Sequence, residues 1–287
     1  MEGSSDCGGG RGAGRVTSSG ADKVFAGSIP KIYETYLVPL LFEPYAADLV
    51  NRLASRGPGR VLEVAAGTGV VTRALASRLP EHVSIVATDL NQPMLDQASA
   101  LGTRRPVEWR QADAMRLPFP DGAFDAVVCQ FGVMFFPDKA RALSEAHRVL
   151  RSRGVLIFNV WDRIEENEFA DSVTTALASV FPEDPPRFLA RTPHAYHVPT
   201  RIAEDLAGGG FVALPEIVTL AARSRAKSPR DPAIAYCQGT PLRSEIEARG
   251  ASRLEEATDV AAAAIGRRFG RGDVDGKIQA HVVTIER

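Results

Sequence analysis

The chain carries the stretch Val61-Leu62-Glu63-Val64-Ala65-Ala66-Gly67-Thr68-Gly69, which runs directly into an amphipathic pattern that begins at Val70. The first residues of this stretch are mostly apolar, as in a buried strand, and the last ones are small. Small residues permit a tight turn that brings backbone N–H groups and a helix N-terminus against a ligand. The stretch therefore predicts a strand, a ligand-binding turn and a helix in direct succession.

Short apolar runs alternate with amphipathic helical patterns around this unit. The predicted strands are residues 61–65, 83–88, 107–111, 124–131 and 155–161, and the predicted helices are residues 70–79, 93–101 and 138–150. Alternating units of this kind form a parallel sheet that is covered by helices on both faces. The sequence therefore predicts an α/β fold, with this core at residues 57–161.

The segments on either side of the core have different patterns. Residues 1–22 are rich in Gly and Ser and contain no aromatic residue, so we expect a disordered tail. Helical spacing between residues 32 and 53, interrupted by Pro39 and Pro44, predicts two or three short helices in an N-terminal helical cap at residues 23–56.

Residues 162–287 mix helical and strand-like patterns. The helical patterns are at residues 165–180, 200–207, 231–249 and 252–269, and the strand-like ones are at residues 216–225 and 277–286. The last strand must return to pair with its neighbours, so a separate domain is not expected. We expect a C-terminal helical lid over the sheet, together with two strands that complete the sheet.

Composition excludes several classes of protein. The 287 residues include 34 Lys+Arg and 35 Asp+Glu, so the formal charge of −1 gives no reason to expect a nucleic-acid partner. No apolar run reaches the ~18 to 20 residues that a transmembrane helix needs. Cys7, Cys129 and Cys237 lack a C-x-x-C spacing, which predicts neither a disulfide framework nor a zinc site. With no apolar signal segment at the start, these features favour a cytoplasmic protein.

Polar residues follow successive predicted strands. Asp89 stands twenty residues after Gly69, where a carboxylate can accept hydrogen bonds from both hydroxyls of a ribose. Asp113 follows the third strand, and its oxygens can accept from the exocyclic amine of adenine while the Ala114 N–H donates to the ring. Gln130 ends the fourth strand. Ligands of open α/β sheets bind at these carboxyl ends, so the sequence predicts a nucleotide-type site.

Several stretches carry a resemblance to a known family. They are residues 61–69, Asp89-Leu90-Asn91-Gln92-Pro93-Met94-Leu95, Gln111-Ala112-Asp113-Ala114, residues 117–125, and residues 145–154. In combination they resemble the class I S-adenosylmethionine-dependent methyltransferases, in the branch of ubiquinone/menaquinone biosynthesis, over roughly residues 33–161. The resemblance implies a Rossmann-like, seven-stranded, mostly parallel sheet whose last strand is antiparallel.

The resemblance also implies S-adenosylmethionine as cofactor and a role for each matching residue. It implies that Glu63 and the turn of Ala65, Gly67, Thr68 and Gly69 hold the methionine end, and that Asp89 binds the ribose. It also implies that Leu90 and Met94 sandwich the adenine, that Asp113 binds the adenine amine, and that Gln130 contacts the methionine moiety or the acceptor. Ala65 stands where the family usually has a glycine. Its methyl group narrows the turn, so we expect an effect on cofactor affinity and not on cofactor identity.

The function implied is methyl transfer to a small-molecule acceptor through an O, N or C nucleophile. Alignment of the two reactants and exclusion of water lower the barrier to such an in-line displacement. A base is needed if the acceptor loses a proton, and the candidates are Tyr33, Tyr36, His147, His194 and His197. Pocket-lining candidates in the last third of the chain are Phe188, Tyr236, Gln238 and Arg243. No catalytic residue and no oligomeric state follow from the pattern.

Two other functions fit part of the pattern. A glycine-rich turn followed by an acid also describes an NAD(P)-dependent oxidoreductase, but the third small residue of that motif and a Tyr-x-x-x-Lys pair are missing. A non-catalytic protein that binds S-adenosylmethionine has the same turn. A metal site is not expected, because no Cys or carboxylate stands at ligand spacing from His194 and His197.

Overall fold

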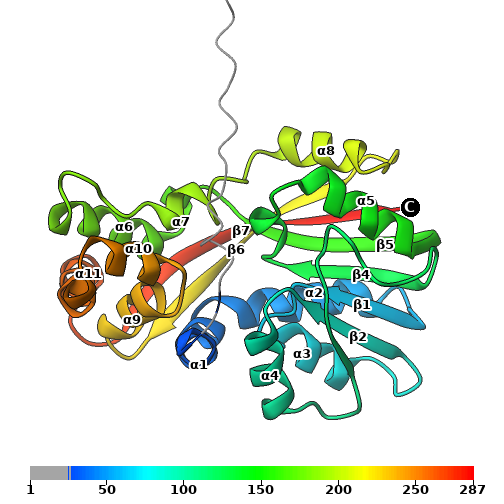
Figure 1. Cartoon of the computed structure of the whole chain (residues 1–287), viewed down its shortest axis with the longest axis horizontal. Coiled ribbons are helices and arrows are strands. Elements are labelled where there is room, and N and C mark those ends of the chain that lie inside the picture. Colours follow the sequence, from blue (N-terminus) through cyan, green and yellow to red (C-terminus); the bar gives the residue numbers. More distant parts are fainter. Residues whose placement is uncertain (1–24, 26) are drawn as a thin grey trace, which may run out of the picture.

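The structure is a computed structural model that describes residues 25 and 27–287, so the tail predicted at residues 1–22 lies outside the described residues. Its strands are β1 Arg60–Val64, β2 Ser84–Asp89, β3 Glu108–Gln111, β4 Phe124–Gln130, β5 Leu150–Trp161, β6 Glu216–Ala226 and β7 Val274–Glu286. They form one seven-stranded sheet in the order β3-β2-β1-β4-β5-β7-β6 (Figure 1). The first five strands are parallel, and β7 is antiparallel to both of its neighbours. The predicted sheet is confirmed.

Helices cover both faces of the sheet, as predicted. The helices between the strands are α3 Val70–Arg78, α4 Gln92–Leu101 and α5 Lys139–Val149. In β1, Val61 packs in the cluster that contains α3, whereas Leu62 packs in the cluster that contains α5. Successive side chains of a strand point to opposite faces, so apolar runs like that of β1 are buried on both sides.

The N-terminal cap is one continuous helical segment. It consists of α1 Ile29–Ile32, the π-helix η2 Tyr33–Phe42 and α2 Glu43–Ala54. The predicted interruption into separate helices is wrong, because Pro39 lies inside the π-helix and Pro44 lies in the first turn of α2. The wider π-turn gives room around a proline ring, and the first turn of a helix tolerates a residue without an N–H donor.

All but the first of the remaining helices follow β5, and the first lies between β4 and α5. They are the short helices η3 Val133–Phe135 and η4 Ile164–Glu166, α6 Glu168–Val180, α7 Phe188–Arg191, α8 Pro199–Gly208, α9 Arg230–Gln238, α10 Leu242–Arg249, η5 Ala251–Arg253 and α11 Leu254–Phe269. Residues 231–249, predicted as one helical stretch, form two helices, and Pro241 stands just before the second one.

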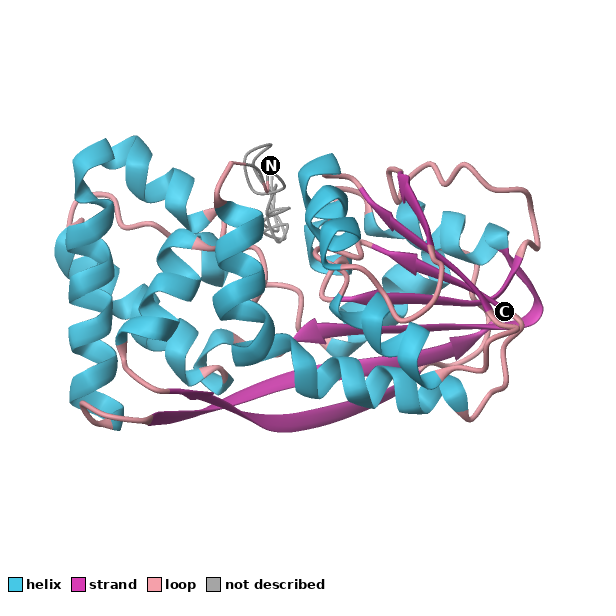
Figure 2. Ribbon diagram, turned by 90° about the horizontal axis from the view of Figure 1, so that it is seen from below, coloured by secondary structure: helices cyan, strands magenta, loops and turns pink. Residues whose placement is uncertain are grey.

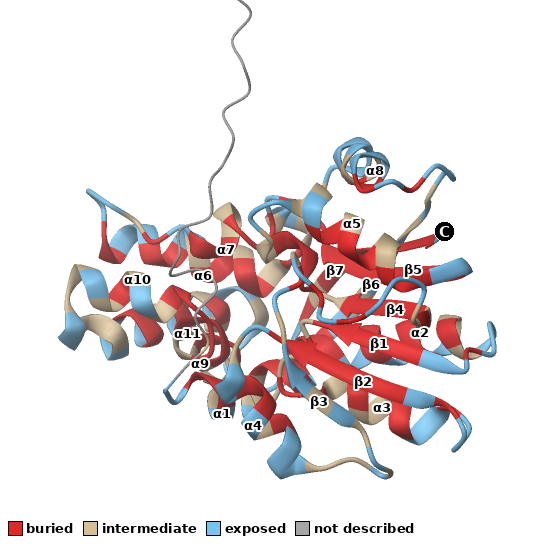
Figure 3. Ribbon diagram, turned by 45° about the vertical axis from the view of Figure 1, so that its right-hand side comes forward, coloured by how far each residue is buried: buried red, intermediate tan, exposed pale blue. Residues whose placement is uncertain are grey.

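The long strands β6 and β7 extend past the other strands (Figure 2). At their far end lie α6, α9, α10 and α11. Helix α8 lies apart from these and packs on α5. Side chains from α6, α9 and α11 belong to the same buried cluster as β4 and β5, so these helices and the sheet share one core (Figure 3). None of the helices formed by residues 25 and 27–287 has the length and apolar composition required to cross a bilayer.

Gly276 of β7 has no side chain, which lets α6 approach this strand. A Cβ placed on Gly276 of β7 would lie 2.9 Å from Cε1 of Phe169 in α6. The Phe169 side chain is fully buried and makes an edge-to-face contact with Phe269 of α11, at 5.0 Å between ring centroids. The position of α6 on β7 therefore depends on a glycine at this point.

We expect Gly276→Ala to lower the free energy of unfolding by about 1–3 kcal/mol, because the added methyl group overpacks the contact with Phe169. Urea denaturation measures the change. Gly272→Ala is the matched control, since a Cβ there meets nothing within 4 Å, and it should change stability by less than ~0.5 kcal/mol. Equal effects of the two substitutions would contradict this account of how α6 is held.

Candidate functional site

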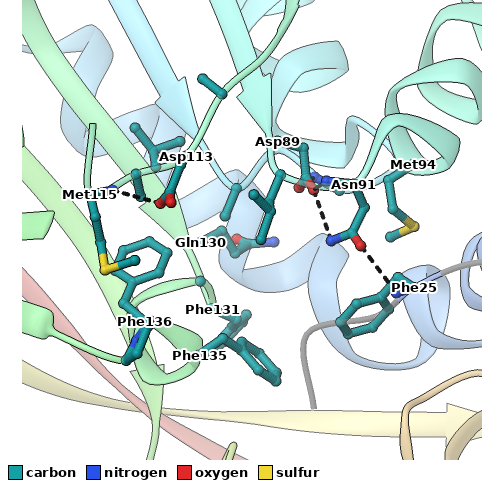
Figure 4. A pocket seen from close by; sticks show the side chains of 18 of the residues that line it. Phe25, Asp89, Asn91, Met94, Asp113, Met115, Gln130, Phe131, Phe135 and Phe136 are labelled. Atoms are coloured by element: carbon teal, nitrogen blue, oxygen red, sulfur yellow. Dashed lines mark hydrogen bonds between the residues drawn. The ribbon is translucent and has the colours of Figure 1, made fainter. Parts of the chain in front are cut away.

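An open pocket of about 830 Å³ lies at the carboxyl ends of β1, β2, β3 and β4 (Figure 4). Most of the predicted site residues line it: Ala65, Gly67, Asp89, Leu90, Met94, Asp113, Ala114 and Gln130. The lining also includes side chains that the motifs did not indicate, namely Phe25, Tyr33, Asn91, Met115, Phe135 and Phe136. The four strand ends therefore gather four separate stretches of sequence around one pocket, and Phe25 and Tyr33 add to its lining.

The turn after β1 depends on left-handed backbone conformations. Ala65, Gly67 and Gly69 have φ angles of 57°, 58° and 84°. Gly69 is the residue before α3, and a Cβ at this position would lie 2.9 Å from Cη2 of Trp109. Glycine adopts positive φ without a steric cost, and it allows this close approach. The small residues of the motif thus form the tight turn that the sequence predicted.

Ala65 occupies space that Gly132 leaves open. A Cβ added to Gly132 would lie 2.5 Å from the Cβ of Ala65 and 2.7 Å from Sγ of Cys129. The alanine methyl group lines the pocket and takes the room beside this glycine. The chain therefore accommodates a side chain at a left-handed position, where most residues other than glycine are strained.

Asp89 connects two of the strand ends. Its Oδ2 accepts a hydrogen bond from Gly67 N at 2.9 Å, and its Oδ1 accepts from Asn91 N at 2.8 Å. Burial raises the pKa of Asp89, while the backbone hydrogen bonds from Asn91 and Gly67 act in the opposite direction. Each carboxylate oxygen has further lone pairs, so this side chain can still accept hydrogen bonds from a ligand in the pocket.

Asp113 and Gln130 complete the polar lining. Asp113 is exposed, and its Oδ1 accepts from Met115 N at 2.9 Å. Gln130 Nε2 donates to the Phe42 carbonyl at 3.3 Å, whereas its Oε1 is buried and has no hydrogen-bond partner. An unpaired buried acceptor costs roughly 1–3 kcal/mol. Gln130 Oε1 therefore marks a place where a ligand's N–H or O–H group belongs.

Three predicted residues do not line the pocket: Glu63, Thr68 and Gly69. Glu63 is only 1% exposed, and its Oε2 accepts from the Thr72 hydroxyl at 2.5 Å. Burial raises the pKa of Glu63 to about 8, so the carboxyl group is mainly protonated at neutral pH. All three residues are buried in β1 and the turn, outside the lining of the pocket.

A second pocket, of about 570 Å³, adjoins the first and shares Phe25, Tyr33, Phe131 and Phe135 with it. Its other lining residues are Leu37, Leu41, Phe42, Trp161, Asn167, Phe188, Leu189, Pro193, His194, Tyr236 and Thr240. Phe188 and Tyr236 were candidates, whereas Gln238 and Arg243 do not line it. Most of the others went unnoticed because they stand in segments without a motif.

Phe131 forms the wall between the two pockets. Its φ of 52° is left-handed, and its ring stacks on Trp161 with 3.7 Å between centroids. Its backbone N–H donates to both the carbonyl and the side-chain oxygen of Asn159, each at 3.1 Å. Strained residues held by such contacts are common at binding sites.

Of the candidate bases, Tyr33 and His194 line a pocket, and Tyr36, His147 and His197 do not. Burial raises the pKa of Tyr33, so its phenol stays protonated near neutral pH. His147 lies on α5, where it makes an edge-to-face contact with Phe211. Of the three candidate histidines, His194 is therefore the one that lines a pocket.

Comparison with known proteins agrees with this site. Residues 62–158 match the model of the methyltransferase domain family. The demethylmenaquinone methyltransferase of Thermus thermophilus is 40% identical over 129 residues, in a match that covers 38% of this chain and 58% of that protein. The ubiquinone/menaquinone biosynthesis C-methyltransferase of Citrifermentans bemidjiense is 36% identical over 112 residues, covering 38% of this chain and 48% of that protein. The chain thus spans about half the length of the curated relatives it matches.

Among solved structures, the chain is similar to phospholethanolamine N-methyltransferase 2 of Haemonchus contortus, which was determined with phosphomonomethylethanolamine and S-adenosylhomocysteine. The TM-score is 0.56 at 16% identity, and the match covers 91% of this chain and 56% of that one. At this identity the likeness shows the fold alone. The matched family model adds that residues 62–158 are similar to methyltransferase domains, as the motifs predict.

Proposed function

We propose that this protein transfers a methyl group from S-adenosylmethionine to a small-molecule acceptor. The observation that carries the proposal is the pair of adjoining pockets, which share the side chains of Phe25, Tyr33, Phe131 and Phe135. The first has the polar groups that a nucleoside requires, and the second is walled mainly by aromatic side chains. A transferase needs this arrangement, because two reactants must meet away from water.

The residues of the first pocket fit the cofactor. Asp89 offers carboxylate oxygens for the two ribose hydroxyls, and exposed Asp113 offers an acceptor for the adenine amine. Leu90, which is 46% exposed, and Met94 provide apolar surface for the adenine ring. Gln130 Oε1, buried and unpaired, is suited to accept from the ammonium group of the methionine end. When bound, the cofactor supplies a methyl group already activated by its sulfonium.

The second pocket supports an acceptor with an apolar, ring-shaped body. Stacked Phe131 and Trp161, with Phe42 and Phe188, present flat apolar surfaces to it. We propose a quinol-like or other aromatic acceptor, in keeping with the names of the relatives. Holding both reactants in line, with water excluded, can contribute roughly 7–11 kcal/mol to lowering the barrier.

The two other functions are weaker candidates. The match to a methyltransferase family does not favour an NAD(P)-dependent oxidoreductase. A non-catalytic protein that binds S-adenosylmethionine leaves the second pocket without a purpose. We also propose a reducing, cytoplasmic environment, which suits Cys129 and Cys237 as buried free thiols.

Calorimetry and a radiolabel assay test the function together. We expect the protein to bind S-adenosylmethionine and S-adenosylhomocysteine but not NAD(H). We also expect it to transfer labelled methyl to at least one of 1,4-naphthohydroquinone, catechol and aniline. Binding of NAD(H) without S-adenosylmethionine would refute the proposal. Binding of S-adenosylmethionine without transfer to any of the three acceptors would instead support the non-catalytic alternative.

The substitution Asp89→Asn should weaken S-adenosylhomocysteine binding about 10- to 100-fold. The physical reason is the loss of charge-assisted hydrogen bonds, each worth about 1.5–3 kcal/mol. Calorimetry measures the dissociation constant. Asp96→Asn is the control, because Asp96 is exposed and bonds only Gln92 among the described hydrogen bonds. An Asp89→Asn protein that binds as tightly as this control would argue against the ribose role.

A double-mutant cycle tests whether Ala65 and a side chain at position 132 compete for the same space. Gly132→Ala should lower stability by about 1–3 kcal/mol and weaken S-adenosylhomocysteine binding, since the new methyl group collides with that of Ala65. In an Ala65→Gly background the same change should cost less, and the residual cost comes from Cys129. Thermal denaturation with and without ligand measures both effects. Strict additivity would show that the two positions do not compete for space.

A further inference from the structure

His194 stands in the second pocket, outside the segment that matches the methyltransferase family model. Its side chain is 5% exposed. The other polar side chains that line this pocket are Tyr33, Asn167, Tyr236 and Thr240. Amides and hydroxyls of this kind do not take up a proton near neutral pH, and burial raises the pKa of both tyrosines. Within this lining, His194 is the group that can accept a proton.

The tautomer of His194 follows from its hydrogen bond. Its Nδ1 lies 2.9 Å from the carbonyl oxygen of Asp162. A carbonyl oxygen can only accept, so Nδ1 carries the proton and Nε2 carries a lone pair. The backbone N–H of His194 donates to the Leu189 carbonyl at 3.1 Å, and the imidazole lies against Trp161 with 6.0 Å between centroids. These contacts fix the ring and its orientation.

Asp162 follows Trp161, the last residue of β5, and is itself held firmly. Its Oδ2 accepts from Gln279 Nε2 and its Oδ1 from Arg163 N, both at 2.7 Å, while His281 Nε2 lies 3.4 Å from Oδ1. Burial alone raises the pKa of Asp162, but these hydrogen bonds outweigh it and hold the pKa below its usual range. An ionised carboxylate therefore lies close to His194.

The charged and titratable groups that act on His194 are Asp162, His197 and Glu165. Burial lowers the pKa of His194 to about 4, against the opposing effects of the Asp162 carbonyl and carboxylate. The imidazole is therefore uncharged at neutral pH, and its Nε2 lone pair is available. A proton that arrives during a reaction is stabilised by the nearby Asp162 carboxylate.

We propose that Nε2 of His194 takes the proton from an acceptor that must lose an O–H or N–H proton as it is methylated. This inference rests on the proposed function. The bond from the acceptor to the methyl carbon forms as the carbon–sulfur bond breaks, with its electron pair going to sulfur. The acceptor proton moves to Nε2, and the imidazolium later releases it to water. The positive charge of the sulfonium thus ends on His194 beside an acidic group.

The acceptor class follows from these residues. One side of the second pocket is apolar and aromatic, and one imidazole offers a lone pair. The pocket therefore favours a ring compound with an ionisable hydroxyl or amine, over a purely hydrocarbon acceptor or one that is already charged.

The test compares His194→Asn with wild type. Asparagine places an amide N–H near the Asp162 carbonyl but has no counterpart of the Nε2 lone pair. We expect kcat for the best of the three acceptors named above to fall at least about 100-fold, with KM and the S-adenosylhomocysteine dissociation constant within about threefold of wild type. His147→Gln, on α5 away from both pockets, is the control and should retain wild-type kcat.

Chemical rescue gives a readout that a structural role would not produce. Added imidazole should raise the rate of His194→Ala in proportion to its uncharged fraction, so the rescue should grow as pH rises from 6 to 8. The wild-type kcat should change little over this range, because the low pKa keeps His194 uncharged.

The outcomes separate the two proposals. A wild-type protein that transfers methyl, with a His194→Asn variant within threefold of its kcat, overturns the role of His194 and leaves the proposed function intact. An increase in KM at unchanged kcat also overturns it, because His194 then only binds the acceptor. A wild-type protein that transfers no methyl to any of the three acceptors contradicts the proposed function, and the role of His194 with it.

Discussion

The hydrogen bond from Gly67 N to the Asp89 carboxylate is the interaction on which the site depends. It connects the turn after β1 to the end of β2. The same carboxylate accepts from the backbone N–H of Asn91, the residue before α4. Only glycine adopts the turn at this point without strain, and only a carboxylate can serve two backbone donors and still accept from a ligand. The hydrogen bond therefore joins two of the strand ends that line the first pocket.

The second pocket has a different origin. Its walls come from the N-terminal helices, the ends of β4 and β5, and the helices carried by β6 and β7, which share one buried core. The family model covers residues 62–158 only, so much of this wall lies outside the segment that matches the model. The two pockets are therefore formed largely by different segments of the sequence.

The sequence predicted the sheet because strands such as β1, β2 and β4 are largely apolar and buried. It predicted the first pocket because its residues follow strand ends at recognisable spacings. It did not predict the continuous cap, because a proline ordinarily ends a helix. In the folded chain Pro39 lies inside a π-helix, which the sequence pattern does not indicate. Nor did it predict Phe42, Trp161 or Leu189 in the second pocket. Such residues are ordinary apolar side chains until the folded chain brings them together. His194 was one candidate among five, and the structure places it in that pocket together with Tyr33 and without the other three.

The most direct measurement is a crystal structure with S-adenosylhomocysteine bound. The account predicts that the ribose hydroxyls lie on the Asp89 carboxylate, that a donor of the ligand meets Gln130 Oε1, and that the sulfur faces the second pocket past Phe131. A ligand bound elsewhere, or one whose sulfur points away from His194 and the aromatic walls, would contradict it.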